Sequence, residues 1–348
     1  MLQQTQVKTV LGYWPRWMRA LPNVGALARA SQPRLHKLWE GLGYYSRVRN
    51  LQKAARMILS KHGGRFPQAF DDILELPGIG RYTAGAICSI AFNQPTTILD
   101  GNVSRVLSRL FAIRGDPRSK HTNAELWRLA ENLVRQAAKL DSTLRPPSRF
   151  TFHVSRVTHH GSRIPPSARS CSFLNQSLME LGALICTPRE PKCGSCPVSA
   201  SCAALRLGQV GDFPQLAKRP LSIARRFAAF VAERRGRLLV RRRPAGVVNG
   251  HLWEFPNVEI PAGQGSLKQA ARAALGWTPH QPEPFCRIKH SITRYRMSLE
   301  VYRATPSASS GELGKGRWLT LTQLDRLAFC SAHRKVLEKL KLEQPRRA

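Results

Sequence analysis

The sequence predicts a mainly α N-terminal part followed by an α/β domain. Apolar residues recur at helical spacing through much of residues 1–140, which indicates amphipathic helices. Four of the eight cysteines fall between positions 186 and 202, directly after another helical pattern. Beyond residue 220 the pattern changes to strands. A chain of 348 residues is long enough for about two domains, each with its own hydrophobic core.

The N-terminal helices are marked by apolar faces and by residues that end helices. In RNLQKAARMILSKHG, Leu51, Ala54, Ala55, Ile58 and Leu59 recur at helical spacing, and a Gly63-Gly64 pair follows. The same reasoning predicts helices at 70–76, 81–92, 102–113, about 127–137 and 174–186.

The C-terminal domain is expected to mix strands and helices. RRFAAFVAE and RLLVRRRP flank an Arg-Gly turn and predict a hairpin, and RYRMSLEVYRA predicts a further strand. SLKQAARAALG and HRKVLEKLKL predict helices. Residues 210–220 form a linker, and the Ser-, Arg- and Pro-rich stretch 141–172 predicts a loop or disordered insertion.

The charge balance points to a polyanionic partner. Lys and Arg number 55 against 21 Asp and Glu, so the formal net charge is +34, which favours nucleic acid. A basic proteome rich in Arg is the alternative explanation. No apolar run is long enough to cross a bilayer, and no secretory signal is visible, so we expect a cytoplasmic, bacterial and nucleoid-associated protein.

The clustered cysteines predict a metal site. Cys186, Cys193, Cys196 and Cys202 have the spacing C-x6-C-x2-C-x5-C, and four thiolates in one short loop can hold a 4Fe-4S cluster. A zinc ribbon is the alternative, although zinc ribbons use two C-x2-C pairs and this loop contains one.

Two motifs between helices suggest DNA chemistry. In Leu76-Pro77-Gly78-Ile79-Gly80-Arg81 the glycines would let the backbone approach a phosphate at the start of a helix, as in a helix–hairpin–helix motif; an ordinary turn is the alternative. Asp100 precedes a helix, where an acidic residue is usually an N-cap. In a DNA-binding cleft the same carboxylate could stabilise a sugar cation or orient a water.

The order of several motifs resembles the MutY family of adenine DNA glycosylases, in the helix–hairpin–helix superfamily. The motifs are LQQTQV, WEGLGYYSRVRNL, LPGIGRYTAGAI, ILDGNVSRVL, NQSLMELGALIC and the four cysteines. The resemblance covers about residues 1–140 and 173–215 and continues into the C-terminal domain. It implies a six-helix-barrel part with the hairpin at 1–95, an iron–sulfur domain at 96–209, the 210–220 linker and a Nudix-like lesion-recognition domain at 221–348.

The resemblance also implies an activity and site residues. The activity is hydrolytic excision of adenine opposite 8-oxoguanine or guanine in double-stranded DNA, by a monomer. Asp100 would be the catalytic aspartate, supported by Asn102, and Tyr82 stands where bifunctional relatives carry a Schiff-base lysine, which implies a monofunctional enzyme. Gln4 and Tyr44 match residues that wedge the duplex, although core packing is the alternative for Tyr44. Gly78, Gly80 and Arg81 would contact DNA.

The chain departs from the family pattern in three places. The family's general-acid glutamate would lie two residues before Met1, so we expect either a truncated sequence or a degenerate homologue that binds DNA without efficient excision. The 141–172 insertion is atypical. In the C-terminal domain, His290, Ser291, Ile292 and Thr293 align with the lesion-reading loop, but Ile292 replaces a phenylalanine and cannot stack. The helix SLKQAARAALG also lacks the glutamates that hold Mg²⁺ in Nudix hydrolases.

Three functional classes follow from the sequence. The first is an adenine glycosylase of base-excision repair. The second is an endonuclease III-like glycosylase/lyase, which Tyr82 and the Nudix-like domain disfavour. The third is a DNA-binding protein that has lost catalysis.

Overall fold

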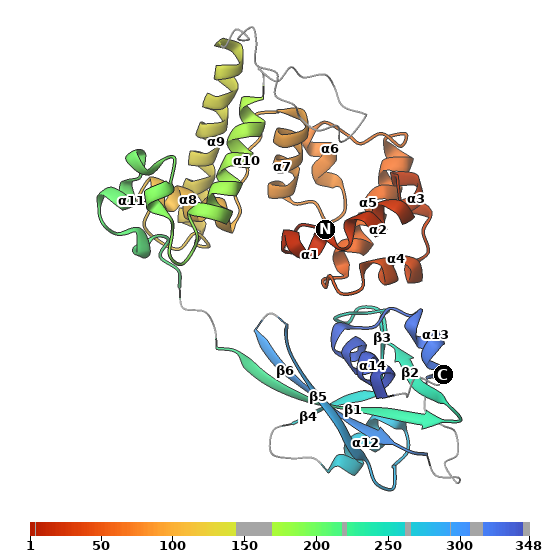
Figure 1. Cartoon of the computed structure of the whole chain (residues 1–348). Helices are drawn as coiled ribbons and strands as arrows, with labels where there is room; N and C mark the ends of the chain where they lie inside the picture. The colour runs from red at the N-terminus through yellow and green to blue at the C-terminus, as the bar shows by residue number, and fades with distance from the viewer. Residues whose placement is uncertain are drawn as a thin grey trace. The chain divides into compact units, whose positions relative to one another are not determined.

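The structure is a computed structural model of the whole chain (Figure 1). It describes residues 1–3, 5–143, 169–217, 221–261, 266–292, 294–306 and 316–343. Gln4, Thr293 and most of the predicted insertion (144–168) therefore lie outside the described residues.

The chain divides into two compact units. One unit combines Met1–Leu59 with Arg219–Ala348, and the other is Ser60–Lys218. The boundary between them falls inside one helix and in the linker that the sequence predicts, so the first unit is assembled from the two ends of the chain.

Residues 141–143 and 170–172, at the two ends of the predicted loop 141–172, are helical instead, because the helices on either side continue into them. The helices of the N-terminal half otherwise follow the predicted patterns. They are α1 (Val7–Leu11), α2 (Trp14–Ala20), α3 (Val24–Arg29), α4 (Gln32–Trp39), α5 (Ser46–Lys61), α6 (Phe70–Glu75), α7 (Arg81–Phe92), α8 (Gly101–Leu110), α9 (Lys120–Thr143) and α10 (Ser170–Glu180). After α10 come the π-helix η1 (Leu181–Ile185), the 3-10 turns η2 (Cys193–Ser195), η3 (Ser199–Ser201) and η4 (Val210–Asp212), and α11 (Ala203–Arg206). No helix in the described residues is both long and apolar enough to span a membrane.

Helix α5 differs from its predicted face in one respect. Leu51 and Leu59 are exposed, whereas Gln52 is buried. The Gln52 side-chain amide donates hydrogen bonds to carbonyls at the C-terminal end of α3, including Ala30 O at 2.7 Å. A buried polar side chain here satisfies carbonyls that a helix end leaves unpaired, which apolar periodicity cannot reveal.

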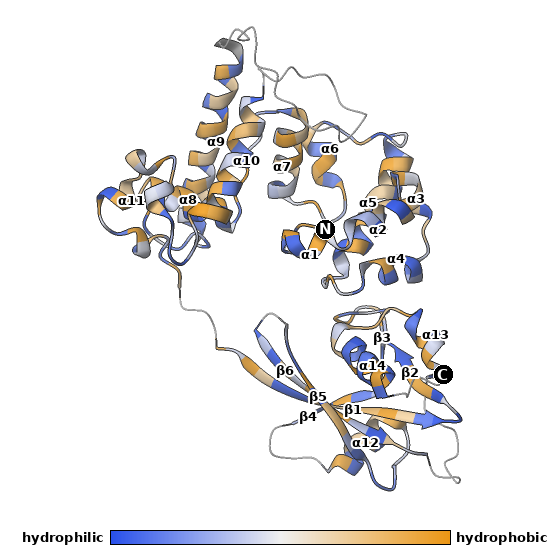
Figure 2. Ribbon diagram, in the orientation of Figure 1, coloured by the Kyte–Doolittle hydropathy of each residue, from blue (hydrophilic) through white to orange (hydrophobic). Residues whose placement is uncertain are grey.

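In the Ser60–Lys218 unit, α7, α8, α9 and α10 pack around one another. The core between them contains Leu99, Val103, Leu107, Leu126 and Leu178. Figure 2 shows hydrophobic and hydrophilic residues alternating around α9 and α10, as expected for helices that bury one face. This core fixes the start of α8, where Asp100 lies.

The C-terminal domain is built on a mixed sheet, and the hairpin, the further strand and both helices predicted for it are confirmed. Its strands run in the order β3-β2-β1-β6-β5, with β4 beside β1 and β7 beside β2; β1 and β6 are parallel, and the other pairs are antiparallel. The elements are β1 (Ile223–Arg234), β2 (Arg237–Arg242), β3 (Trp253–Glu254), β4 (Asn257–Ile260), α12 (Leu267–Leu275), β5 (Glu283–Ile292), β6 (Tyr295–Ala304), β7 (Arg317–Leu319), α13 (Leu321–Asp325) and α14 (Ser331–Glu343).

Candidate active site

Asp100 is the N-cap of α8 and holds its carboxylate in a fixed orientation. Its Oδ1 accepts hydrogen bonds from the backbone N–H groups of Asn102, at 2.9 Å, and Val103, at 2.8 Å. The N-cap role that the sequence predicts for Asp100 is therefore confirmed. Within the described part of the chain, Oδ2 accepts no hydrogen bond. One oxygen orients the carboxylate, and the other is left for a substrate.

Tyr82 shares this neighbourhood. Burial, and next the nearby Asp100 carboxylate, raise the pKa of the Tyr82 phenol, so the ring is neutral and lies within electrostatic reach of that carboxylate. Its hydroxyl points to the sulfur of Met179 on α10, at 3.9 Å. Asp100, Asn102 and Tyr82 thus come from two neighbouring helix starts, α7 and α8, although their catalytic roles stay predictions.

Arg105, one turn further along α8, hydrogen-bonds both to Asn102 and to the segment 182–186 that leads into the clustered cysteines. Its Nη2 donates to Asn102 Oδ1 at 2.9 Å and to Gly182 O at 2.6 Å, while its Nε donates to Cys186 O at 2.8 Å. The guanidinium is buried, and burial lowers its pKa. Because charge-assisted hydrogen bonds are strong, this side chain fixes the Asn102 amide relative to the loop. The sequence motifs did not single out Arg105, since its partners in the loop lie 77 and 81 residues away.

Gly182 allows η1 to approach Asn102 closely. A Cβ at this position would lie 2.8 Å from Asn102 Cβ and 3.0 Å from Asn102 O. These distances are too short for a real Cβ, so only glycine fits without movement. Sequence reasoning missed this residue because a glycine inside a helical pattern carries no sign of what packs on it.

Replacing Gly182 by alanine is expected to lower the free energy of unfolding by about 1–3 kcal/mol, because the new methyl group must push Asn102 away. Excision should also slow, since Asn102 and the Asp100 cap move together. Thermal unfolding and single-turnover kinetics measure the two effects. Gly211→Ala is the control, because a Cβ there meets nothing within 4 Å. Equal stabilities of the two variants would contradict the prediction.

The four clustered cysteines line one pocket. Cys186, Cys193, Cys196 and Cys202 surround it together with apolar side chains and Arg109, and all eight cysteines of the chain are free of disulfides. Burial, and next the neighbouring Cys186, Cys202 and Cys196, raise the pKa of the Cys193 thiol. The Cys193 sulfur therefore lies close to the other three sulfurs of the pocket.

Arg109 braces the loop that carries these cysteines. This buried side chain of α8 donates to Thr187 O at 2.7 Å, to Phe213 O at 2.9 Å and to Cys186 Sγ at 3.4 Å. A guanidinium beside a thiolate ligand offsets negative charge on the sulfur. It also holds both ends of the loop against α8.

The cysteine pocket suits an iron–sulfur cluster. Four thiolates around one pocket match the four-cysteine ligand set of a 4Fe-4S cluster, and a cationic metal core would relieve the mutual repulsion of the thiolates. The apolar lining, which includes Ile185 and Leu205, would exclude water from such a cluster.

The predicted hairpin is formed by the residues between α6 and α7. Gly78 has a φ of +85°, a conformation that glycine adopts without strain. Gly80 is the N-cap of α7 and supplies no side-chain cap, and the N-terminal end of this 12-residue helix carries the positive end of the helix dipole, which favours an anion. The Arg81 guanidinium lies 3.9 Å from the centroid of the Trp127 ring on α9, so this cation is held beside the helix start.

Tyr44 projects from a tight turn between α4 and α5. It is 52% exposed and has a φ of +45°, which is strained for a residue with a Cβ. Arg47 donates to the carbonyls of Leu42 and Gly43 in this turn, and its guanidinium lies 5.7 Å from the centroid of the Tyr44 ring. By contrast, Tyr45 is buried in the core. An exposed ring on a strained turn is available for a ligand.

Of the residues predicted to read the lesion, His290, Ser291 and Ile292 lie at the end of β5 in the β5–β6 hairpin. Strand pairing sets Ser291 opposite Arg296 and Ile292 opposite Tyr295, so the hairpin turn falls directly after Ile292. Burial, and next Lys335, lower the pKa of His290, which keeps its imidazole neutral. Tyr295, which the sequence motifs did not single out, lies beside the Arg225 and Arg294 guanidiniums and adds an aromatic ring at this end of the hairpin.

A second group of potential ligands lies in the C-terminal domain. Glu254, Cys330 and His333 are buried and bring one ligand atom each within 4.8 Å of one another. However, Arg241 and Arg243 each form an ion pair with Glu254, and His333 Nδ1 accepts a backbone hydrogen bond at 3.1 Å. Burial also raises the pKa of Cys330 to about 12. The group is an internally satisfied polar cluster whose arginines would repel a metal ion.

Two family models match this chain. Residues 1–132 match the family model of the HhH-GPD superfamily base excision DNA repair proteins, and residues 228–339 match a NUDIX domain. The adenine DNA glycosylase of Rattus norvegicus is 34% identical over 97% of this chain and 69% of its own length. The chain belongs to the adenine DNA glycosylase family. The relatives of Homo sapiens (33% identity, 99% of this chain, 67% of theirs) and Schizosaccharomyces pombe (32%, 95% and 76%) extend over both units.

The family assignment confirms the resemblance and the fold class that the sequence predicts: a helical glycosylase part followed by a Nudix-like domain. It also places the chain among DNA glycosylases, enzymes that hydrolyse N-glycosidic bonds. Iron–sulfur binding is typical of this group of proteins. The roles of single residues are not tested by these similarities and stay predictions.

Proposed function

We propose that the chain removes adenine from double-stranded DNA in which adenine lies opposite 8-oxoguanine or guanine, acting as a monomer in base-excision repair in the bacterial cytoplasm. The observation that carries the proposal is the Asp100 carboxylate, fixed through one oxygen with the other left open. The family's reaction needs such a group beside a flipped nucleotide, since breaking the glycosidic bond leaves a cationic sugar.

Asp100 would stabilise that cation electrostatically. Its negative charge costs no reorganisation during the reaction, because the cap already holds the carboxylate in place. Asn102, whose amide Arg105 orients, would hold a sugar or water at the same helix start. Tyr82 carries no amine, so it forms no Schiff base with the sugar, and water is the nucleophile of a monofunctional enzyme.

Three separate elements would bind the duplex. The N-terminal end of α7, with its positive dipole, would favour a backbone phosphate, which positions DNA without reading its sequence. The exposed Tyr44 ring would fill the gap that a flipped adenine leaves in the stack, and Gln4 would wedge the duplex as the resemblance implies. The end of β5, from His290 to Ile292, would contact the opposite base together with Thr293, as the resemblance implies.

Cys186, Cys193, Cys196 and Cys202 would hold a 4Fe-4S cluster. When bound, the cluster cross-links the loop that follows η1 and has no assigned redox step. Arg105 and Arg109 bind that loop to α8, and Asp100 caps the start of the same helix. The basic residues of the loop, including Arg189 and Lys192, would then face a phosphate backbone.

The two candidate functions of this chain, fast adenine excision and DNA binding with little excision, differ in whether a general acid is present. The resemblance puts this glutamate two residues before Met1, so it is not among the 348 residues. A second candidate function, left open by the sequence, is a homologue that binds DNA with little excision. Both candidates share Asp100 and the binding elements, and the difference between them is one proton donor.

A version extended upstream by the family's segment with the glutamate is expected to excise adenine at least ~10²-fold faster than residues 1–348, since general acid catalysis contributes that much. Single-turnover excision from a duplex with adenine opposite 8-oxoguanine measures both. A control with glutamine in place of the added glutamate should stay slow. Equal rates for all three proteins would refute the assignment of the general acid.

A further inference from the structure

The first 59 residues and the C-terminal domain share one hydrophobic core, although the whole Ser60–Lys218 unit separates them in sequence. Trp39, Leu42 and Tyr45 from the N-terminal helices pack in the same cluster as Leu252, Ala328 and Cys330 from the C-terminal domain. All six are less than 9% exposed. Such a core couples the movements of both segments because protein interiors are close-packed.

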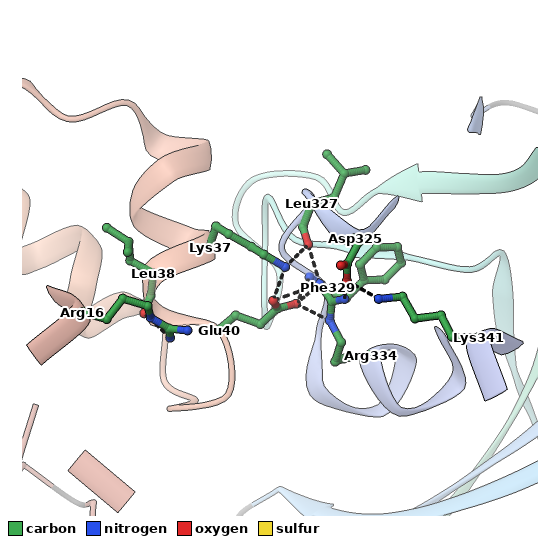
Figure 3. A network of polar contacts seen from close by, with 9 residues as sticks. All are labelled: Arg16, Lys37, Leu38, Glu40, Asp325, Leu327, Phe329, Arg334 and Lys341. Carbon is green, nitrogen blue, oxygen red and sulfur yellow. Dashed lines mark hydrogen bonds and ion pairs between the residues drawn. The ribbon is translucent and has the colours of Figure 1, made fainter. Parts of the chain in front are cut away.

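A partly buried ion pair lies at this shared core (Figure 3). Arg334 of α14 forms a bidentate pair with Glu40, in which Nε donates to Oε1 at 2.7 Å and Nη2 donates to Oε2 at 2.9 Å. The backbone N–H of Phe329 adds a bond to Oε1 at 2.8 Å, and Lys37 adds one to Oε2 at 2.7 Å. The Glu40 carboxylate therefore accepts four hydrogen bonds, three of which come from the C-terminal domain.

The pair is shielded from solvent on both sides. The side chains of Arg334 and Glu40 are only 14% and 13% exposed. Arg334 also donates to Leu327 O at 2.6 Å and to Asp325 Oδ1 at 3.1 Å, so each of its three guanidinium nitrogens already has a partner within the protein. Removing one partner of such a pair leaves the other charge unpaired and poorly hydrated, which destabilises this packing of the two segments. Arg334 is thus unavailable for direct contact with a phosphate.

On the N-terminal side, Glu40 is joined to the Tyr44 turn by a stiff segment. The Trp39 indole donates to Gly43 O at 3.0 Å. Gly41 has a φ of +99°, and a Cβ there would clash with the Tyr13 hydroxyl, so this backbone is tightly enclosed. These contacts link the position of Glu40 to that of Tyr44, four residues later.

On the C-terminal side, Arg334 is joined to the lesion-reading hairpin. Helix α14, which carries Arg334, packs against β5, the strand that ends at Ile292. The next residue, Lys335, is close enough to His290 to lower the pKa of its imidazole. The position of β5 is therefore linked to Arg334 through one helix.

We propose that Glu40 and Arg334 form a latch through which the C-terminal domain sets the position of the Tyr44 turn. The pair makes insertion of Tyr44 depend on which base the β5–β6 turn contacts, so both are positioning residues that determine specificity for the mispair. This inference rests on the proposed function.

The test measures equilibrium binding of the full chain to two duplexes that carry a 2′-fluorinated, cleavage-resistant adenosine opposite either 8-oxoguanine or guanine. The readout is the ratio of the two dissociation constants. Both Arg334→Met and Glu40→Gln are expected to reduce this preference for 8-oxoguanine roughly 5-fold or more, the usual lower range of coupling between sites. The double variant should lose no more than either single variant, because the two changes break the same contact.

Two features separate the latch from simpler effects. The substitutions change the net charge in opposite directions, so a general electrostatic effect would weaken binding of both duplexes in one variant and strengthen it in the other. Arg303→Met, which breaks the exposed pair with Glu343, removes the same charge from the same domain and should leave the ratio within about 2-fold. Hydrogen exchange at residues 42–45 should accelerate in both latch variants and not in this control.

Failure of the latch and failure of the proposed function are distinguishable, because adenine excision tests only the proposed function. If the unaltered chain binds both duplexes equally, no preference exists for the pair to control and the latch is overturned, while the proposed function, excision of adenine opposite either base, stands. If it discriminates and both latch variants discriminate equally well, the latch is overturned while the proposed function stands. Loss of stability without a change in the ratio would also overturn the latch, because it would show a purely structural pair.

Discussion

Replacing Asp100 by asparagine is expected to lower the rate of adenine excision at least ~10³-fold while leaving the fold and DNA binding intact. The loss follows from the chemistry: a neutral amide cannot stabilise a cationic sugar, and preorganised charge is usually the largest single contribution to catalysis. The fold should persist because asparagine is as good an N-cap as aspartate, so its side-chain oxygen can keep the bonds to Asn102 and Val103.

Single-turnover excision should be measured for this variant both in residues 1–348 and in the version extended with the glutamate, alongside binding to the cleavage-resistant duplex. Asp100→Ala is the informative control. It removes charge and cap together, so it should add a stability loss of about 1 kcal/mol that the asparagine variant lacks. An asparagine variant that excises adenine at the rate of the parent would show that Asp100 only caps the helix.

Asp100 shows which features the sequence alone can predict. Local chemistry predicted both its capping role and its place at a helix start, because a cap depends on residues two and three positions away. In the same way, the glycine at position 78 and the alternation in 294–304 predicted a hairpin and a strand that the structure confirms. Each of these features depends on residues that lie close together in the sequence.

What the sequence could not reveal depends on contacts between distant segments. Arg105 and Gly182 matter through each other and through Asn102, and neither has a local pattern that marks it. The Glu40–Arg334 pair joins residues 294 positions apart. Gln52 reads as an ordinary surface residue of α5, yet it satisfies carbonyls of α3. Each of these side chains acquires its role only when the helices have packed.

The grouping of Met1–Leu59 with the C-terminal domain has the same origin. A linker at 210–220 suggests a division of the chain into successive domains, since composition changes there. Hydrophobic contacts follow space and not sequence, and Leu252, Ala328 and Cys330 complete the core of the first helices. The unit that carries Tyr44 is therefore the unit that carries the β5–β6 hairpin.

Replacing Cys193 by alanine is expected to abolish stoichiometric iron binding and to destabilise the Ser60–Lys218 unit by several kcal/mol. Metal binding contributes directly to folding when the ligands come from a short loop with little core of its own, as here between η1 and η4. For a unit of this size, that loss corresponds to a fall in the melting temperature of roughly 10 °C. Iron and sulfide analysis and thermal unfolding of the purified variant measure the two effects.

Cys286→Ala provides the matched control, because Cys286 is a partly buried thiol of the C-terminal domain outside the pocket, and its iron content should equal that of the parent. The consequence for catalysis follows from the two arginines of α8. Without the cluster, Arg109 still holds Thr187 and Phe213, so the ends of the loop stay near α8 while its middle is released. Arg105 then loses a fixed partner at Cys186 O and orients Asn102 less well, so excision should slow more than DNA binding weakens. Full iron content in Cys193→Ala, or a melting temperature equal to that of the Cys286 control, would contradict the assignment of the pocket as a cluster site.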